Sequence, residues 1–223
     1  MFQVKICGIT SLADAQAAAD AGADAIGLNF YPKSPRFVQQ ETAQEICQQL
    51  PQLTKVGLFV NESVTTIRQL ADQVGFDAIQ LHGDEPPETI AELSEFRIIR
   101  ALRCQQPNLQ MVQQYWQQCQ QLDALPETIL LDAHAPGQYG GTGQSLDWNQ
   151  LHPLPPSMEG SNWVLAGGLT ATNVAEAISL AHPDGVDTAS GVEIQPGQKD
   201  PQQIGQFVQA ARTALAEVAD KTS

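Results

Sequence analysis

The stretch 130–148 holds the densest group of residues in the chain that could take part in chemistry. An apolar run, 128–131, ends in the carboxylate of Asp132, and four glycines follow, Gly137, Gly140, Gly141 and Gly143. α/β proteins use a strand, a polar residue and a glycine-rich loop to present reactive groups and backbone N–H donors to a ligand. The alternative is a plain strand and turn with a surface Asp. So many glycines are unfavourable in chain entropy, which favours a functional loop.

Cys7 is the second candidate, at the end of a strand-like run and directly before Gly8. If Cys7 and Asp132 point into one cavity, the thiol and the carboxyl group suit paired general base and general acid work. A thiol with an ordinary pKa of about 8.5 is a base at neutral pH only if that pKa is lowered. A carboxyl group near about 3.9 is an acid there only if its pKa is raised, as a nearby anionic substrate would do. The alternative for Cys7 is packing as a small buried hydrophobe.

Three more loops contain candidate binding residues. Gly167–Gly168 and Ser190–Gly191 follow the last two strand-like segments. Glycines let backbone N–H groups approach an anion, and (β/α)8 barrels often bind phosphate at these two loops. Two tight turns are the alternative. Arg36 follows the second strand-like segment, where it either pairs bidentately with a carboxylate or is an ordinary surface residue.

The histidines and the other cysteines predict no metal site. His82 ends the fourth strand-like segment, where it lines the mouth or serves as a structural imidazole, and His134 has a similar standing. No two histidines have metalloprotease spacing and no two cysteines have C-x-x-C spacing, so we expect neither a metal nor a disulfide framework. Cys47 and Cys119 are expected to pack on helices. Cys104 follows the fifth strand-like segment and could face the mouth.

Eight strand-like segments that alternate with eight helix-like ones position these residues. Strict alternation implies parallel strands, and eight units in 223 residues predict an α/β fold, a single-domain (β/α)8 TIM barrel. An open doubly wound sheet is the alternative, but it usually has about five or six strands. The predicted strands are 3–7, 25–30, 55–60, 78–81, 97–102, 128–132, 162–166 and 186–189. The predicted helices are 12–21, 41–50, 64–74, 87–93, 109–122, a very short one near 147–151, 172–181 and 201–218.

The barrel model makes further predictions. We expect the catalytic domain to span 1–219 and the tail 220–223 to fray. Closure brings the last strand beside the first, and side chains alternate along a strand. Lys5 and Asp187 should therefore approach each other inside the barrel.

Composition excludes several classes of partner. The formal net charge is -14 and no basic run occurs, which argues against nucleic acid and against an anionic membrane surface. We see neither a targeting signal nor an apolar stretch long enough to span a bilayer, and the cysteines fit a reducing compartment. A cytoplasmic location is the expectation. The sequence leaves a homodimer open.

Six motifs then occur in a recognisable order along nearly the whole chain. They are Lys5–Thr10 (KICGIT), Phe30–Arg36 (FYPKSPR), Gln80–Glu85 (QLHGDE), Leu131–Asp132 with Tyr139–Gly143 (YGGTG), Leu165–Leu169 (LAGGL) and Ser190–Glu193 (SGVE). In this order they resemble the phosphoribosylanthranilate isomerase family of tryptophan biosynthesis.

The resemblance implies an Amadori rearrangement of N-(5-phosphoribosyl)anthranilate to 1-(2-carboxyphenylamino)-1-deoxyribulose 5-phosphate, without a cofactor. By this resemblance Asp132 protonates the furanose ring oxygen as general acid and Cys7 removes the proton from C2 as general base. Arg36 would hold the anthranilate carboxylate. The phosphate would be held by the backbone of three loops, namely Gly141, Thr142 and Gly143, then Gly167 and Gly168, then Ser190 and Gly191.

Two positions depart from the family pattern. Ala189 stands where Ser is expected, and Gln144 where the family is often basic, so backbone donors would carry more of the phosphate binding. Two other functions remain open. Another sugar-phosphate isomerase or epimerase would use paired carboxylates or a metal, and a non-catalytic barrel that binds a sugar phosphate would need neither Cys7 nor Asp132.

Overall fold

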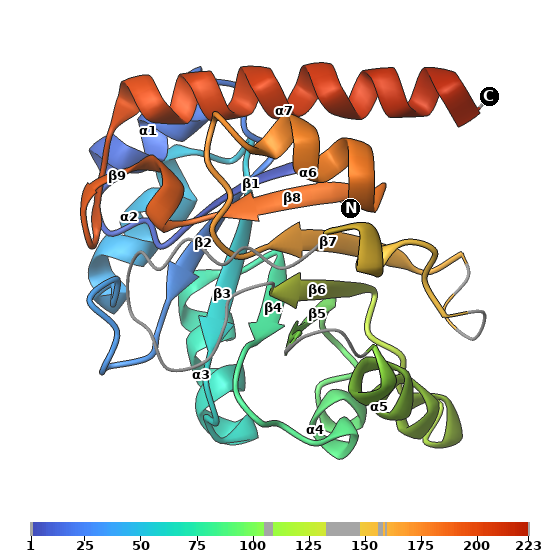
Figure 1. Cartoon of the computed structure of the whole chain (residues 1–223). Coiled ribbons are helices and arrows are strands. Elements are labelled where there is room, and N and C mark those ends of the chain that lie inside the picture. Colours follow the sequence, from blue (N-terminus) through green and yellow to red (C-terminus); the bar gives the residue numbers. More distant parts are fainter. Residues whose placement is uncertain (1, 105–108, 133–147, 156–157, 159, 223) are drawn as a thin grey trace.

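The protein is a closed barrel of eight parallel strands with helices on its outside (Figure 1). The computed structural model describes residues 2–104, 109–132, 148–155, 158 and 160–222. The strands pair in chain order, and β8 pairs with β1 through the Lys5–Asp187 register. The predicted single-domain (β/α)8 barrel is confirmed.

The barrel strands are β1 (Val4–Cys7), β2 (Ala25–Asn29), β3 (Thr54–Phe59), β4 (Ala78–Leu81), β5 (Ile98–Arg103), β6 (Thr128–Asp132), β7 (Asn162–Ala166) and β8 (Gly185–Thr188). The α-helices are α1 (Leu12–Asp20), α2 (Gln40–Gln49), α3 (Val64–Val74), α4 (Pro87–Glu92), α5 (Gln110–Gln121), α6 (Val174–Ala181) and α7 (Pro201–Thr222). The short helix expected near 147–151 is a 3-10 helix, η1 (Trp148–Leu151). The domain boundary at residue 219 stays a prediction.

One element was missed by the sequence analysis. A two-stranded antiparallel hairpin, β9 (Glu193–Gln195) and β10 (Gln198–Lys199), lies between β8 and α7. Gly197 lies at its turn with φ +84°, a left-handed conformation that favours glycine. A Cβ at Gly197 would lie 2.7 Å from the carbonyl oxygen of Pro35, so the hairpin packs closely on the loop after β2.

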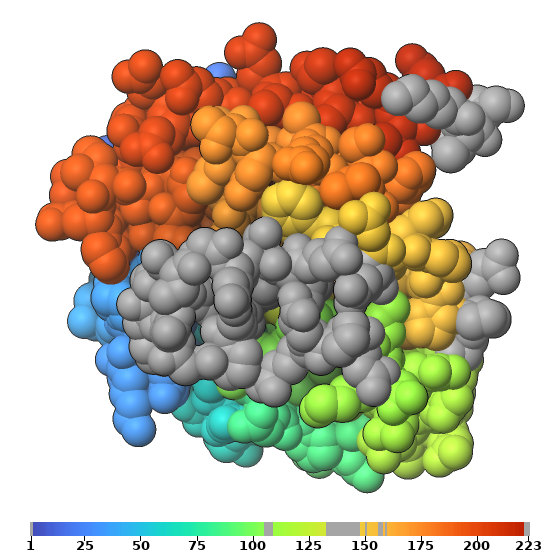
Figure 2. Space-filling model, viewed as in Figure 1, coloured from blue at the N-terminus to red at the C-terminus, as the bar shows by residue number. Residues whose placement is uncertain are grey.

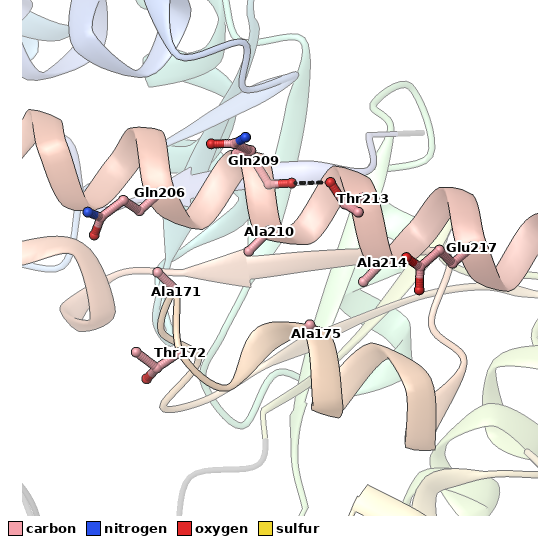
Figure 3. A pocket seen from close by; sticks show the side chains of 9 residues that line it. All are labelled: Ala171, Thr172, Ala175, Gln206, Gln209, Ala210, Thr213, Ala214 and Glu217. Carbon is pink, nitrogen blue, oxygen red and sulfur yellow. Dashed lines mark hydrogen bonds between the residues drawn. The ribbon is translucent and has the colours of Figure 1, made fainter.

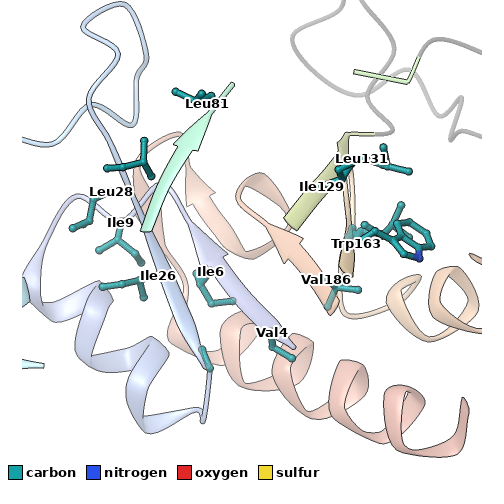
Figure 4. Packing of buried hydrophobic residues seen from close by; sticks show 14 of the residues in the cluster. Val4, Ile6, Ile9, Ile26, Leu28, Leu81, Ile129, Leu131, Trp163 and Val186 are labelled. Carbon is teal, nitrogen blue, oxygen red and sulfur yellow. The ribbon is translucent and has the colours of Figure 1, made fainter. Parts of the chain in front are cut away.

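The hydrophobic core has two layers, as alternation of side chains along barrel strands requires. A small inner layer fills the barrel with residues such as Val56, Leu130 and Val164. A large outer layer packs the strands against the helices, and Figure 4 shows Ile6, Ile26 and other strand residues of this layer. Membership of a layer therefore tells whether a strand residue points to the axis or to the helices.

A repeated carboxylate marks the amino-terminal rim of the barrel. An acidic residue directly precedes each even-numbered strand, and its backbone N–H donates to a carbonyl of the preceding strand. The four residues are Asp24, Asp77, Glu127 and Asp184. Three of the four carboxylates also accept a backbone N–H at the start of the neighbouring odd-numbered strand. These carboxylates fasten the strands in pairs at the end opposite the predicted site.

The outer surface contains a cleft between α6 and α7. Its volume is about 540 Å³, and the close-up in Figure 3 shows that small and polar side chains surround it. The lining residues are Ala171, Thr172, Ala175, Gln206, Gln209, Ala210, Thr213, Ala214 and Glu217. In the space-filling view α7 forms a ridge along one edge of the molecule (Figure 2). None of the predicted site residues that the structure describes lines this cleft. Among the described residues, no helix has the length and hydropathy needed to cross a membrane.

Candidate active site

Cys7 and Asp132 end two parallel strands and therefore lie at the same, carboxyl-terminal end of the barrel. Leu130 belongs to the inner layer of the core, so Asp132, two residues further along β6, points to the axis as well. On β1 the inward residue Lys5 gives Cys7 the same orientation. Cys7 is buried, and the side chain of Asp132 is 19% exposed. A thiol and a carboxyl group thus face one mouth, the first requirement for acid–base work.

Lys5 and Asp187 form the contact predicted from barrel closure. The Lys5 Nζ atom donates to Asp187 Oδ1 at 2.9 Å, and the two side chains are 0% and 7% exposed. Burial by itself lowers the pKa of Lys5, but the Asp187 carboxylate and the Cys7 thiol more than offset this, so the pKa of Lys5 is raised. The prediction is confirmed, and a buried charge pair lies under the mouth.

The surroundings of Cys7 act on its thiol in opposite directions. Burial raises the pKa of Cys7, while the ammonium groups of Lys5 and Lys199 lower it, with a net increase. The neighbouring strand makes room for these groups at Gly27, where a Cβ would lie 2.7 Å from Cys7 Sγ and 3.2 Å from Lys5 Nζ. The lowered pKa that a base needs at neutral pH is favoured by the lysines and opposed by burial.

Arg36 is part of an ion-pair network that the sequence analysis did not foresee. Its Nε and Nη2 donate to the two carboxylate oxygens of Glu193 at 2.8 and 2.6 Å. Lys199, fully buried, donates to the same carboxylate at 2.8 Å and to the carbonyl oxygen of Ala189 at 2.9 Å. Burial raises the pKa of Glu193, but the two cations hold it below its ordinary value.

Arg36 is therefore no isolated surface residue, although the carboxylate it binds here belongs to the protein. Its side chain crosses the loop after β1, where a Cβ at Gly8 would lie 2.5 Å from Arg36 Cδ. The hairpin that carries Glu193 and Lys199 has a sequence signal, the Pro196-Gly197 pair between two polar–apolar segments. Nothing in the sequence, however, indicates which cation the hairpin would meet.

His82 lies in the mouth beside Asp132. Its Nε2 is 3.4 Å from Asp132 Oδ2, and its Nδ1 is 2.9 Å from the amide nitrogen of Gln80. Because an amide N–H only donates, Nδ1 accepts in this arrangement and Nε2 carries the proton that points to Asp132. His82 thus lies beside the carboxyl group of Asp132, and whether it serves as a mouth-lining or a structural residue stays a prediction.

A buried ion pair holds the loop of His82 in position. Arg100 donates to Glu85 at 2.8 Å and to the carbonyl oxygens of Leu81 and Gly83 at 2.9 and 3.0 Å. Glu85 also accepts the backbone N–H groups of Asn61 and Gly83. The loops after β3 and β4 are thereby fixed to each other around one carboxylate.

The two described glycine loops lie next to each other. Gly167 and Gly168 have φ of +94° and +68°, conformations in which glycine is favoured. Ser190 begins a 3-10 turn, and a Cβ at Gly191 would overlap the carbonyl oxygen of Leu169. The third candidate loop, with Gly141, Thr142 and Gly143, lies outside the described residues, as do His134 and Gln144.

One cysteine faces the wrong way for a site residue. Cys104 belongs to the outer layer of the core, and its N–H donates to the carbonyl oxygen of Asp132. β5 continues to Arg103, which shares the inward orientation of Ala101 and pairs in register with Asp132. The expectation that Cys104 could face the mouth is wrong by one residue, and the exposed cation Arg103 was missed. Among the described residues no group of three or more His, Cys, Asp or Glu could hold a metal ion.

Comparison with known proteins shows the same family along nearly the whole chain. The family model for N-(5'phosphoribosyl)anthranilate (PRA) isomerase matches residues 4–210. The N-(5'-phosphoribosyl)anthranilate isomerase of Pelobacter propionicus is 44% identical over 97% of this chain and 99% of its own length. That of Myxococcus xanthus is also 44% identical, over 95% and 96%.

Solved structures agree. The phosphoribosyl anthranilate isomerase of Thermotoga maritima superposes with a TM-score of 0.84 at 38% sequence identity. The superposition covers 96% of this chain and 100% of the Thermotoga maritima chain. Another structure, at TM-score 0.81 and 36% identity over 96% and 100%, is of the enzyme in complex with reduced 1-(o-carboxyphenylamino)-1-deoxyribulose 5-phosphate. The Thermotoga maritima enzyme is described as dimeric. The chain belongs to the N-(5'-phosphoribosyl)anthranilate isomerase family and is an isomerase.

Proposed function

We propose that the chain converts N-(5-phosphoribosyl)anthranilate to 1-(2-carboxyphenylamino)-1-deoxyribulose 5-phosphate in tryptophan biosynthesis, with Asp132 as general acid and Cys7 as general base. The observation that carries the proposal is the common orientation of the two groups toward the barrel axis at one end of a family-typical barrel. A family member with a reduced product bound supports the substrate class.

The reaction needs two proton transfers within one sugar. Asp132 gives a proton to the furanose ring oxygen, the bond from that oxygen to C1 breaks, and the anthranilate nitrogen forms a Schiff base with C1. The Cys7 thiolate then removes the proton from C2, and the electrons of that C–H bond form the enolamine that tautomerises to the ketose. Each transfer contributes about 10²–10⁴-fold to the rate.

The charged ends of the substrate require separate partners. Glu193 uses two of the five guanidinium N–H donors of Arg36, which leaves three for the anthranilate carboxylate. Glu193 also fixes the plane of that group. Backbone donors of Gly167–Gly168 and Ser190–Gly191 are proposed for the phosphate, together with Gly141–Gly143. Here Ala189 offers no hydroxyl, in line with backbone binding.

The test is isomerisation of N-(5-phosphoribosyl)anthranilate by the purified protein, compared with Cys7→Ala and Asp132→Asn. We expect turnover by the wild type, and a loss of about 10²–10⁴-fold in kcat for each variant. Both variants should still bind the reduced product. Turnover of Cys7→Ala close to that of the wild type would discard the mechanism, and a wild type without isomerase activity would discard the function.

Two further expectations accompany this function. A homodimer is proposed from the description of the Thermotoga maritima relative, and sedimentation of the purified protein tests it. A cytoplasmic location stays a prediction from the sequence.

A further inference from the structure

The charged side chains around Cys7 do not balance. In the described part of the chain, three cations and two carboxylates lie below and beside the thiol, where one carboxylate pairs with one cation and the other with two. They are Lys5, Arg36, Lys199, Asp187 and Glu193. The cluster carries one excess positive charge in a protein whose formal net charge is -14. When the Cys7 thiol is ionised, the thiolate supplies a third negative charge and the charges of the cluster balance.

Lys5 is the cation best placed to act on Cys7. The two residues are separated by one position on β1 and both point into the barrel. A single point, the Cβ position at Gly27, lies 2.7 Å from Cys7 Sγ and 3.2 Å from Lys5 Nζ. Lys5 is fully buried, so no solvent screens its charge from the thiol.

We propose that Lys5 is a positioning residue of the isomerase reaction, whose buried ammonium group stabilises the thiolate of Cys7. The proposal rests on the proposed role of Cys7 as general base. Lys5 keeps its proton throughout and transfers none. It acts through its positive charge, in the ground state of the free enzyme as well as with substrate bound.

Asp187 has the complementary task of keeping Lys5 charged and in place. An unpaired buried ammonium group would lose its proton, and the 2.9 Å ion pair prevents this. The same carboxylate repels a thiolate, so Lys5 must act on Cys7 more strongly than Asp187 does. The two charges therefore have opposite effects on Cys7, which a purely structural role of the pair would not produce.

The experiment titrates the Cys7 thiolate directly through its ultraviolet absorbance as a function of pH, without substrate. Each protein is paired with the same protein carrying Cys7→Ser, so that the signals of Cys47, Cys104 and Cys119 cancel. In Lys5→Met the apparent pKa of Cys7 should rise by about 1–3 units, the range for loss of a close opposite charge.

The double variant Lys5→Met/Asp187→Asn removes both charges and carries the test if Lys5→Met does not fold. Its Cys7 pKa should also rise. Its kcat at neutral pH should drop in proportion to the loss of thiolate at that pH, and it should recover with increasing pH. An unchanged thiol pKa in the double variant would overturn the proposal. Failure of the proposed function is distinguishable, because the wild type then shows no isomerisation. Failure of Cys7 as general base is distinguishable as well, because Cys7→Ala then keeps its turnover whatever the thiol titration shows.

Discussion

Two arginine–glutamate pairs at opposite rims of the barrel have the same geometry and different surroundings. Arg36 binds Glu193 at the carboxyl-terminal mouth, and Arg97 binds Glu127 at the amino-terminal rim, each with hydrogen bonds of 2.8 and 2.6 Å. The side chain of Glu193 is 4% exposed and that of Glu127 is 36% exposed. Solvent weakens the Arg97–Glu127 pair. In the buried Arg36–Glu193 pair, loss of one partner would leave the charge of the other uncompensated.

The difference extends to the two rims as wholes. At the amino-terminal rim each acidic residue bonds a strand next to it, and Asp24 also binds Arg212 of α7, so these contacts hold neighbouring elements together and serve stability. At the mouth the contacts join loops distant in the sequence, such as Arg36 and Glu193, which are separated by 157 positions. Barrel enzymes generally divide stability and chemistry between the two ends in this way.

The largest effect is expected when a carboxylate is changed to an amide at the mouth, and the same change at the other rim is the matched control. Asp132→Asn should lower kcat by about 10²–10⁴-fold, because an amide cannot give up the required proton. Asp184→Asn, the matched change at the other rim, should leave kcat within about twofold and lower the stability by about 1 kcal/mol or less, since it weakens one hydrogen bond to Trp163. Steady-state kinetics and thermal unfolding of both variants measure this. Equal losses of kcat would remove the functional distinction between the rims.

The next effect concerns the two Arg–Glu pairs. In Glu193→Gln the guanidinium of Arg36 loses its charged bidentate partner, so KM should rise by about tenfold, or roughly 1.4 kcal/mol of binding. In Glu127→Gln we expect no change in KM and a stability change of about 0–1 kcal/mol. A KM for Glu193→Gln equal to that of the wild type would show that Arg36 needs no orientation by Glu193.

The pH dependence of kcat/KM tests the burial of Cys7. The base must be ionised, and burial raises the pKa of Cys7 above its ordinary value. The rate should therefore rise with pH beyond about 8.5 and lose about tenfold per pH unit below the apparent pKa. The exposed carboxylates of the other rim have no part in this profile, so Asp184→Asn should leave it unchanged. A plateau that begins near neutral pH would mean that the cations lower the pKa of Cys7 by more than burial raises it.

The smallest effects come from two glycines. Gly27→Ala would bring a Cβ within 2.7 Å of Cys7 Sγ, and such overpacking should lower stability by about 1–3 kcal/mol. Gly205→Ala on α7 has open space around it and should raise stability by about 1 kcal/mol through better helix propensity. Denaturant unfolding of the two variants gives both signs. A Gly27→Ala variant as stable as the wild type would argue against the close packing of Cys7, Lys5 and β2.

Alternation along parallel strands was enough to predict the barrel and several inward residues. β4, β6 and β7 have the predicted bounds, and the Lys5–Asp187 pair follows from closure plus the two-residue period. The same period explains the error at Cys104. β5 contains one more residue than predicted at this end, Arg103, which points inward, so that Cys104 points to the helices. Strand ends are the least certain feature of a sequence pattern, and site residues lie at strand ends.

The ion-pair network of the mouth was beyond the sequence. Glu193 stands in a recognisable motif, yet its partners Arg36 and Lys199 are fixed by how the hairpin folds over the loop after β2. Such contacts depend on packing across the whole chain, for which local patterns have no signal. The net pKa shift of Cys7 likewise depends on burial balanced against two lysines from different elements.

The measurement that tests the central claim most directly is single-turnover conversion of substrate carrying deuterium at C2 of the ribose. The wild type should show a slower step than with ordinary substrate, and Cys7→Ala should convert either substrate at least about a hundredfold more slowly while still binding it. Loss of the C2 deuterium at the wild-type rate in Cys7→Ala would contradict the account, because another group would then be the base.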